Sequence, residues 1–352
     1  MVDNNIFIKV KTTIKHALKL MDKMGAKTLF VVDKDNYLLG VVSGGDIRRS
    51  LLKGHNLDGG VEAIMNKEPL TVDATISTEV VKKLMIDNKF EAIPVVDSKN
   101  QIKEILLWHK VFNEKRVVVA KEIDIPVVIM AGGKGTRLDP FTRILPKPLI
   151  PIGDKAIIEI IMDEYLKFGM KEFYISVNFK SKMIKAFFEE RDNDYKLHYI
   201  YEEKPLGTAG SLKLLKDKIN RPFFVSNCDI IIDDDYSQIY DFHVKEKNAL
   251  TLVASIQHHV IPYGVCEIEE GHKLKGIIEK PEYDLWVNTG MYLLNPEMID
   301  EIPDDEFFHI TDLISKAMKK GYKVGVYPVS EKSWIDIGHW SEYKSAVEKL
   351  TV

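Results

Sequence analysis

The 352-residue sequence has little cysteine and no long apolar run. Its two cysteines, Cys228 and Cys266, are too few for a disulfide framework or a cysteine-based metal site. No apolar stretch approaches the length that spans a bilayer, and the start MVDNN lacks the cationic and apolar pattern of a signal peptide. We therefore expect a cytoplasmic protein with no membrane partner.

The sequence also lacks long runs of one charge. Its formal net charge is −4, so no basic footprint for nucleic acid is present and we expect no nucleic-acid partner. What the chain does have is apolar material, because 45% of its residues are hydrophobic. At this length, that is enough for two domains with proper cores.

The first third of the chain resembles itself at an offset of about 64 residues. Residues 29–33 (LFVVD) correspond to residues 93–97 (IPVVD). Each copy predicts an amphipathic helix (13–24 and 77–88), a strand, a turn (34–36 and 98–100) and a second strand. Neither copy alone would bury its apolar face, so we expect the two to pack as a tandem pair.

The first copy ends in GVVSGGDIRRSLLKG, which resembles the strand-turn-helix of a CBS domain, and the pair resembles a Bateman module. The resemblance implies an adenine nucleotide whose ribose is bound by Ser43 and Asp46. The second copy has Leu107 and Lys110 at the matching places, so at most one such site is implied. Ser43 and Asp46 would equally cap the helix that begins near Ile47, and both interpretations stay open.

Residues 113–125 carry mixed charges around a short apolar strand at 117–119 and end in Pro126. We place the domain junction here. The tandem pair then occupies residues 1–118, divided into about 1–57 and 58–118, and the second domain occupies residues 119–352.

Strands and helices alternate along the second domain. The pattern predicts strands at 127–131, 172–177, 198–201 and 223–227, and helices at 157–168, 181–190 and 208–216. This rhythm indicates an α/β fold with a Rossmann-like, mixed and mostly parallel sheet that has helices on both faces. Ligands of such sheets gather at the carboxyl ends of the strands.

The first of these strands runs into a glycine-rich loop within VVIMAGGKGTRLDPFTRILPKP, residues 127–148. Gly132, Gly133 and Gly135 leave the backbone amides open to a polyanion, and Arg137 and Lys147 supply fixed positive charge. The spacing fits neither a Walker loop nor the Rossmann fingerprint. The segment is nevertheless a phosphate-handling loop by its chemistry.

The complete string resembles the signature of the sugar-1-phosphate nucleotidyltransferases. The resemblance implies that a sugar 1-phosphate attacks the α-phosphate of a nucleoside triphosphate in line and that pyrophosphate leaves. Arg137 would steady the pyrophosphate and Lys147 the α-phosphate, as the catalytic pair. The three loop glycines and Thr136 would contact the nucleotide.

Two aspartates at separate places in the chain are candidate Mg²⁺ ligands. Asp229 follows the apolar strand at 223–227, where a carboxylate suits a hard cation that bridges phosphates. Asp336 lies in WIDIG, which resembles the Trp-x-Asp-x-Gly element that supplies the family's second ligand. The three aspartates at 233–235 precede a helical pattern, so we expect them to be helix-capping and first-turn charges.

Three further segments resemble sugar-binding elements of the family. The resemblance implies that Glu279 accepts hydrogen bonds from sugar hydroxyls and that Lys280 holds the sugar phosphate. Gly264, in YGV, would let the backbone approach the sugar ring. Asn288 and Thr289, in NTG, would offer partners to its hydroxyls.

The choice of base depends on YEEKPLGTAGSL, where the family packs the base against the turn of Pro205 and Gly207, followed by Thr208. Related uridylyl and thymidylyl enzymes typically have glutamine at the position of Glu202. A carboxylate only accepts hydrogen bonds, which favours the two adjacent donors of guanine. Glu203 could serve instead, or both glutamates could face solvent.

With the CBS-like pair in front, the chain most resembles bacterial guanylyltransferases that activate glucosamine 1-phosphate for legionaminic acid synthesis. We therefore expect GTP and glucosamine 1-phosphate as substrates. A mannose-1-phosphate guanylyltransferase, a glucose-1-phosphate uridylyl- or thymidylyltransferase, and a non-catalytic nucleotide sensor stay as alternatives. We also expect a homo-oligomer, although no motif defines its size.

Overall fold

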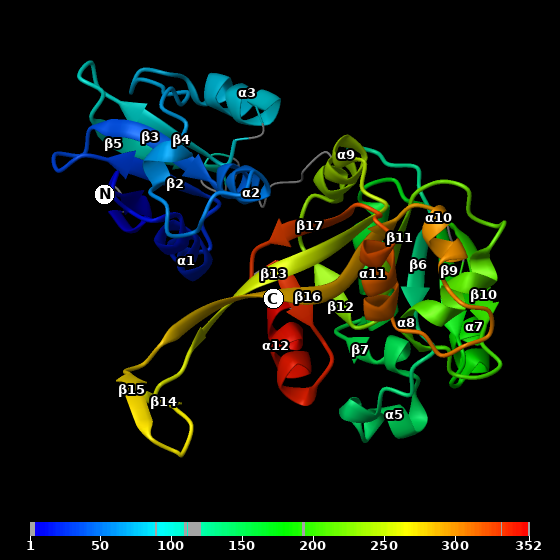
Figure 1. Ribbon diagram of the computed structural model, residues 1–352. Coiled ribbons are helices and arrows are strands. Elements are labelled where there is room, and N and C mark those ends of the chain that lie inside the picture. The colour runs from blue at the N-terminus through cyan, green and yellow to red at the C-terminus, as the bar shows by residue number, and fades with distance from the viewer. Residues whose placement is uncertain are drawn as a thin grey trace. The chain divides into compact units, whose positions relative to one another are not determined.

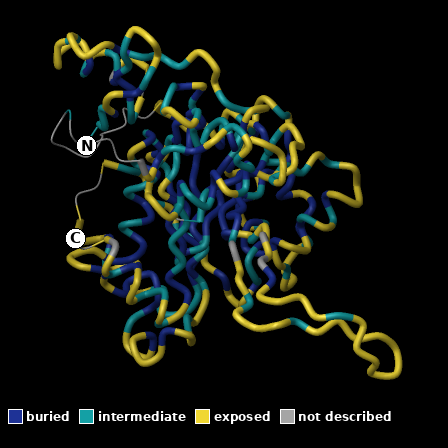
Figure 2. The backbone as a smooth tube through the Cα atoms, turned by 90° about the vertical axis from the view of Figure 1, so that its left-hand side faces the viewer, coloured by how far each residue is buried: buried dark blue, intermediate teal, exposed yellow. Residues whose placement is uncertain are grey.

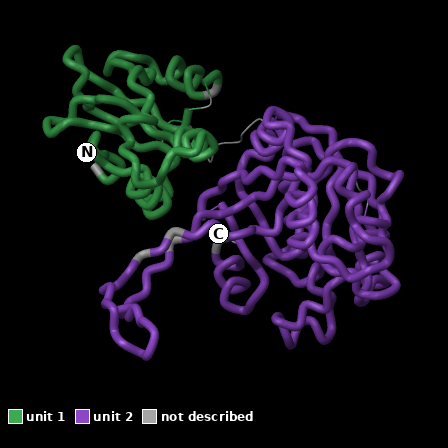
Figure 3. The backbone as a smooth tube through the Cα atoms, in the orientation of Figure 1, with its two compact units in different colours: residues 1–119 green, residues 120–352 purple. Residues whose placement is uncertain are grey.

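The structure is a computed structural model that describes residues 4–88, 90–108, 111, 121–191, 194–331 and 333–350. The chain divides into two compact units, residues 1–119 and 120–352 (Figure 3). Lys110 and the strand expected at 117–119 lie outside the described residues. No helix in the described part of the chain is long and apolar enough to cross a membrane.

Unit 1 contains the two copies of the repeat, each built on an antiparallel strand pair. Its elements are η1 (Asn4–Ile6), β1 (Phe7–Ile8), α1 (Ile14–Met24), β2 (Thr28–Val32), β3 (Leu38–Ser43), α2 (Gly44–Leu52), η2 (Val61–Ala63), α3 (Thr78–Asn88), β4 (Ala92–Val96) and β5 (Ile102–Leu107). The two expected turns contact each other, because Leu38 N donates to Asn100 O over 2.9 Å and Ile102 N to Asn36 O over 3.1 Å. The copies therefore pair turn to turn.

Unit 2 is built on a seven-stranded sheet in the order β10-β9-β6-β11-β16-β13-β17 (Figure 1). Within it, β16 runs antiparallel to both neighbours, and all the other neighbouring pairs are parallel. The predicted mixed, mostly parallel sheet is confirmed. The strands are β6 (Val127–Met130), β9 (Glu172–Val177), β10 (Lys196–Tyr201), β11 (Phe223–Asn227), β13 (Leu250–Val260), β16 (Glu282–Leu294) and β17 (Val324–Val329).

Helices cover both faces of this sheet, as the alternation of buried residues along its strands requires. Val127 and Ile129 face one core and Val128 the other. The first core takes α6 (Ile157–Leu166), α7 (Ser181–Glu189), α9 (Tyr236–Glu246) and α12 (Trp340–Leu350). The second takes α8 (Gly207–Gly210), η5 (Ser211–Leu215), α10 (Glu297–Asp300) and α11 (Ile310–Lys319).

The single helix expected at 208–216 is wrong. Its place is taken by the short helix α8 and the 3₁₀ helix η5. The amides of Ala209 and Gly210 donate to the carbonyl of Phe308, over 3.0 and 3.1 Å, rather than within a long helix. A tertiary contact that the local pattern does not encode thus overrides helix propensity.

Short elements surround the carboxyl ends of β6 and β11. They are η3 (Thr136–Leu138), α5 (Phe141–Ile144), η4 (Lys147–Leu149), β7 (Pro151–Ile152), β8 (Lys155–Ala156), β12 (Ile230–Ile232) and β18 (Trp334–Asp336). The pairing of β12 with β18 is antiparallel and joins residues more than a hundred positions apart. It brings the two predicted metal-binding segments together.

Strands β13 and β16 continue beyond the sheet as a two-stranded ribbon. The pairing of β13 with β17 ends at Ser255, whereas its pairing with β16 runs on to Val260. The ribbon carries a terminal hairpin of β14 (Val265–Ile268) and β15 (Leu274–Ile278). We call residues 256–287 the arm, and its hairpin stands clear of the rest of unit 2 in both Figure 1 and Figure 2.

Candidate functional site

The glycine-rich loop folds onto Lys147. Gly135 has φ +65°, and a Cβ there would lie 2.8 Å from Lys147 Cβ and 3.0 Å from Thr142 Cγ2. Glycine meets both demands, since it adopts positive φ freely and has no Cβ. Nothing lies within 4 Å of a Cβ at Gly133, which faces open space, and Thr136 begins η3. The loop thus presents open backbone beside a buried lysine.

Lys147 forms an ion pair with Asp229. The ammonium group contacts Asp229 Oδ2, and the two side chains are only 8% and 16% exposed. Asp229 follows β11 in the turn to β12, at the carboxyl edge of the sheet. A pair so far removed from water interacts more strongly than a surface pair. The structure therefore joins the predicted loop lysine to one predicted metal ligand.

Asp336 lies beside this pair. It is the register partner of Ile230, and Ile337 N donates to Asp229 O over 2.7 Å. Burial, and then the nearby charge of Asp229, raises the pKa of the Asp336 carboxyl. Gly338 N donates to Asp336 Oδ1 over 2.6 Å and fixes its orientation. Lys147 thus pairs with Asp229, and its charge also acts on Asp336, where it partly offsets the rise in pKa.

This donor set suits a hard divalent cation. Within the described ranges, no three His, Cys, Asp or Glu side chains gather in a way that could hold a metal. Mg²⁺ is commonly bound by one or two carboxylates, with water and substrate phosphates completing its shell. Asp229 and Asp336 fit that pattern. The charge of Asp229 disfavours the charged form of the Asp336 carboxyl, and a bound cation would offset this repulsion.

Two residues close to Asp229 have structural roles. Asp235 caps α9 by accepting from Ser237 N over 3.0 Å, which confirms the expected helix cap. The expected first-turn charges are wrong, because Asp233 and Asp234 precede the cap and the first turn of α9 has no acidic residue. Cys228 is buried and free, and burial together with the charge of Asp229 raises the pKa of its thiol to about 12. The thiol is therefore protonated at neutral pH and is no nucleophile.

The start of α12 holds the far end of the loop. Arg137 Nη1 lies 3.1 Å from His339 Nε2, an interaction that sequence reasoning missed. Trp340 donates from Nε1 to Asp139 O over 2.9 Å, and its ring centroid lies 5.1 Å from that of Phe141. The only sequence signal is that His339 and Trp340 directly follow the WIDIG element.

Glu202 is buried and connects two loops. Its Oε2 accepts from Leu206 N over 3.1 Å, and its Oε1 accepts from the hydroxyl of Ser176. A Cβ at Gly132 would lie 2.5 Å from Glu202 Oε1, so the glycine-rich loop passes directly over this carboxylate. The alternative that both glutamates face solvent is therefore wrong for Glu202, whereas Glu203 is exposed.

The rest of the expected base-binding turn packs against the segment before α11. Gly207 has φ +81°, and a Cβ there would lie 2.6 Å from Phe308 O. Thr208 Oγ1 accepts from Ile310 N over 3.0 Å, while Pro205 is exposed. Gly207 and Thr208 thus position the turn through α11.

Of the sugar-binding candidates, Asn288 and Thr289 directly precede Gly290, which lies against the end of β11. A Cβ at Gly290 would lie 2.5 Å from Nδ2 of Asn227, at the end of β11. Asn288 Nδ2 donates to Tyr292 Oη over 2.7 Å. Thr289 is buried and its hydroxyl donates to Val253 O over 2.8 Å, so its proton is already used within the sheet.

The other three candidates, Gly264, Glu279 and Lys280, lie together on the arm. They occupy the joint between the long β13–β16 ladder and the terminal hairpin. A Cβ at Gly264 would lie 3.0 Å from Glu279 Oε2, and Lys280 has φ +44°. The motif residues are therefore divided between the sheet edge and the arm.

In unit 1, Ser43 and Asp46 form a capping box at the start of α2. Asp46 N donates to Ser43 Oγ over 3.2 Å, and Ser43 N donates to Asp46 Oδ2 over 2.8 Å. The Asp46 carboxylate also pairs with Arg49 at 2.6 Å. Capping accounts for both residue types, so nucleotide binding there stays a prediction.

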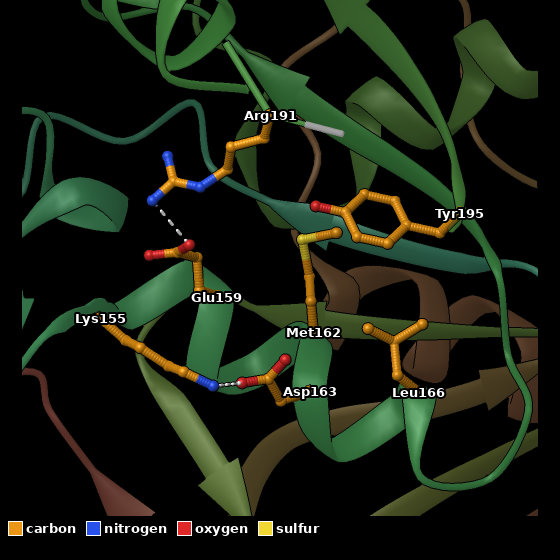
Figure 4. Close-up of a pocket in the computed structure, with 7 residues that line it drawn as sticks. All are labelled: Lys155, Glu159, Met162, Asp163, Leu166, Arg191 and Tyr195. Atoms are coloured by element: carbon orange, nitrogen blue, oxygen red, sulfur yellow. Dashed lines mark hydrogen bonds and ion pairs between the residues drawn. The ribbon is translucent and has the colours of Figure 1, made fainter. Parts of the chain in front are cut away.

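A separate surface hollow of about 310 Å³ lies at α6 (Figure 4). Its charged side chains pair with each other, Lys155 with Asp163 at 2.6 Å and Arg191 with Glu159 at 2.9 Å. None of the predicted site residues lines it, and its charges are already neutralised. We therefore assign the candidate site to the edge that holds Lys147, Asp229 and Asp336.

Comparison with known families gives two matches. Residues 126–352 match the nucleotidyl transferase family, and residues 1–53 and 61–114 match the CBS domain. A mannose-1-phosphate guanyltransferase of Yarrowia lipolytica is 34% identical over 50% of this chain and 50% of its own. The Saccharomyces cerevisiae protein of the same name is 31% identical over 62% of each chain.

A crystal structure of HddC from Yersinia pseudotuberculosis is also similar, with 26% identity and a TM-score of 0.51. The match covers 64% of this chain and 99% of HddC, which has also been crystallised with GMP-PN. The chain spans from half to just under two-thirds of the length of the two guanyltransferases above. The match to the nucleotidyl transferase family lies within unit 2.

Proposed function

The chain belongs to the nucleotidyl transferase family, and we propose that it is a sugar-1-phosphate guanylyltransferase. It would convert GTP and a hexose 1-phosphate into a GDP-sugar and pyrophosphate. The observation that carries this proposal is the buried Lys147–Asp229 pair, with Asp336 beside it and the glycine-rich loop folded over it. A binding-only sensor would not need two carboxylates and a lysine at one point.

The roles of the charged groups follow from phosphoryl-transfer chemistry, which depends on positioning and charge neutralisation. Lys147 would hold the α-phosphate, and Arg137 would steady the departing pyrophosphate. The sugar phosphate is already anionic at neutral pH, so no general base is required. Asp229 and Asp336 would hold Mg²⁺, which neutralises charge on the phosphates when bound.

Guanine is the base that Glu202 favours. Each oxygen of its carboxylate accepts one hydrogen bond from the protein, and a carboxylate oxygen has capacity for two. The remaining capacity accepts only, which matches the adjacent donors of guanine. Relatives named as guanyltransferases, and HddC crystallised with GMP-PN, support the same base.

For the sugar we retain two candidates. Glucosamine 1-phosphate is expected from the CBS-containing bacterial enzymes of legionaminic acid synthesis that the sequence resembles. Mannose 1-phosphate is supported by the names of the relatives.

The adenine nucleotide expected at Ser43 and Asp46 would act as a regulator. Calorimetry of the whole chain with AMP, ADP and ATP tests this proposal.

The proposed activity is tested by measuring pyrophosphate release for GTP, ATP, UTP and dTTP against mannose, glucosamine and glucose 1-phosphates with Mg²⁺. We expect the highest kcat/KM with GTP and one of the first two sugars. A preference for UTP or dTTP would contradict the role given to Glu202. Absence of turnover with every pair would contradict the enzyme assignment itself.

A further inference from the structure

Helix α5 connects the two positively charged parts of the candidate site but cannot complete its own carboxyl end. It lies between Arg137 in η3 and Lys147 in η4, and it has only four residues. Pro146 favours an extended conformation of the preceding Leu145, which has φ −100° and ψ 144°. The helix therefore ends at Ile144, and its last carbonyls need donors from elsewhere.

Lys180 supplies these donors. Its Nζ donates to Arg143 O over 2.6 Å and to Thr142 O over 3.2 Å. A lysine side chain is favourable at the carboxyl end of a helix, because it can bond the last carbonyls. Figure 1 shows α5 at one end of unit 2, where it stands off the sheet. The half-buried Lys180 thus ties α5 to the turn between β9 and α7.

The backbone of Lys180 adopts a conformation that lysine does not favour. Lys180 immediately precedes α7 and has φ +53°, in the left-handed region where a Cβ is unfavourable. A positive charge is also unfavourable at the amino end of a helix. The turn alone would therefore favour glycine, and the contacts of the ammonium group with α5 are what lysine adds.

A displacement of α5 would reach the charged cluster through Thr142. Thr142 is buried, and a Cβ at Gly135 would lie 3.0 Å from Thr142 Cγ2 and 2.8 Å from Lys147 Cβ. A second bond to the same segment comes from Trp340, whose Nε1 donates to Asp139 O over 2.9 Å. Together with the ammonium contacts, this bond fixes the segment between the glycine-rich loop and Lys147.

We propose that Lys180 is a positioning residue for the reaction. By bonding the carbonyls of Thr142 and Arg143, it holds the glycine-rich loop and Lys147 in the geometry that in-line transfer requires. This inference rests on the proposed function for the role of Lys147. In such chemistry a displacement of about 1 Å can lower the rate about 10²-fold. Lys180 acts through α5 and not on the nucleotide itself.

The residue that would read the base is held separately. Asn178 Nδ2 donates to Glu202 O over 2.6 Å, and the hydroxyl of Ser176 donates to Glu202 Oε1. Neither bond involves Lys180. We therefore expect loss of the ammonium group to slow turnover with every nucleotide alike, and to leave the ratio of kcat/KM for GTP to that for UTP unchanged.

The positioning is tested by a pair of substitutions at one residue. Lys180→Gly removes the ammonium group and relieves the backbone, because glycine adopts positive φ freely. We expect its Tm to stay close to that of the wild type while kcat for pyrophosphate release falls about 10- to 100-fold. Lys180→Arg keeps donors for both carbonyls and should recover most of kcat.

Lys182→Met is the matched control, because Lys182 is exposed on α7 and should not affect kcat. Wild-type kcat in Lys180→Gly overturns the proposal. An equal loss of kcat in Lys180→Arg and Lys180→Gly also overturns it.

Hydrogen exchange gives a readout that does not depend on turnover. In substrate-free protein, we expect the peptide covering residues 136–146 to exchange about tenfold faster in Lys180→Gly than in the wild type, and at the wild-type rate in Lys180→Arg. Peptides of α9 should be unchanged. Equal exchange of residues 136–146 in Lys180→Gly and wild type overturns the inference, whereas absence of turnover in the wild type contradicts only the proposed function.

Discussion

Lys147 and Asp229, 82 residues apart in the sequence, form a buried ion pair at the carboxyl edge of the sheet of unit 2. Asp336 reaches the same point from the end of the chain through the pairing of β18 with β12. The loop glycine Gly135 is required there because no Cβ fits against Lys147. Three distant segments thus converge on one charged cluster.

Lys147→Met should abolish most turnover while removing the buried cation. We expect kcat to fall about 10²–10³-fold, because a charge contact that strengthens in the transition state is lost. The variant should also be less stable, since Asp229 is left buried without its partner. In thermal unfolding, adding Asp229→Asn should restore the stability of Lys147→Met without restoring turnover. Equal instability of the double variant would contradict the pairing.

Asp336→Asn should stabilise the metal-free protein at neutral pH. The raised pKa of Asp336 means that the folded state holds this proton more tightly than the unfolded state does. At pH values below the ordinary pKa of 3.8, the protonated Asp336 carboxyl therefore contributes to the stability of the folded state. This contribution is lost as the pH rises through the raised pKa of the folded state. Asparagine keeps an oxygen that can accept from Gly338 N and carries no charge.

We expect the gain in Tm for Asp336→Asn, measured with EDTA, to be present at pH 7 and to shrink as the pH approaches 4. Mg²⁺ should raise the Tm of the wild type and have little effect on the variant, whose turnover should fall about 100-fold. A lower Tm for the variant at pH 7 would contradict the claim that the charge of Asp336 destabilises the metal-free fold.

His339→Ala should weaken the hold on pyrophosphate. His339 Nε2 lies against the guanidinium of Arg137, so a neutral imidazole accepts a hydrogen bond that orients it. In the reverse reaction we expect the KM for pyrophosphate to rise about tenfold, with a smaller change in the KM of the GDP-sugar. His339→Gln retains an acceptor oxygen and should recover much of the loss. Equal effects on both KM values would indicate general damage.

Glu202→Gln should reduce the preference for GTP. The amide nitrogen can face Ser176, whose hydroxyl is able to accept, while the amide oxygen keeps the bond from Leu206 N. We expect the kcat/KM ratio of GTP to UTP to fall about tenfold, the equivalent of one good hydrogen bond. Ser176→Ala, which leaves the carboxylate in place, is the matched control and should keep the ratio.

Much of the fold was predictable because hydrophobic periodicity is a local signal. The strands expected at 172–177 and 223–227 are β9 and β11, and α1 and α6 begin within a residue of the expected positions. The asparagines of the two expected turns in unit 1 have the positive φ that such turns favour. These features depend on neighbours in sequence.

What was missed depends on contacts between distant segments. The helix expected at 208–216 is divided because Phe308 accepts its amides, and the roles of Glu202 and His339 arise from partners in other elements. The projection of Lys280 on the arm follows from where the pairing with β17 ends. No sequence pattern within residues 264–281 predicts this position of Lys280.

The central claim is most directly tested by identifying the product. Wild-type protein with GTP, Mg²⁺ and either mannose or glucosamine 1-phosphate should form a GDP-sugar, seen by mass spectrometry, in equal amount to the pyrophosphate released. Lys147→Met and Asp229→Asn should form almost none. Product formation by both variants at the wild-type rate would contradict the placement of the reaction at this ion pair.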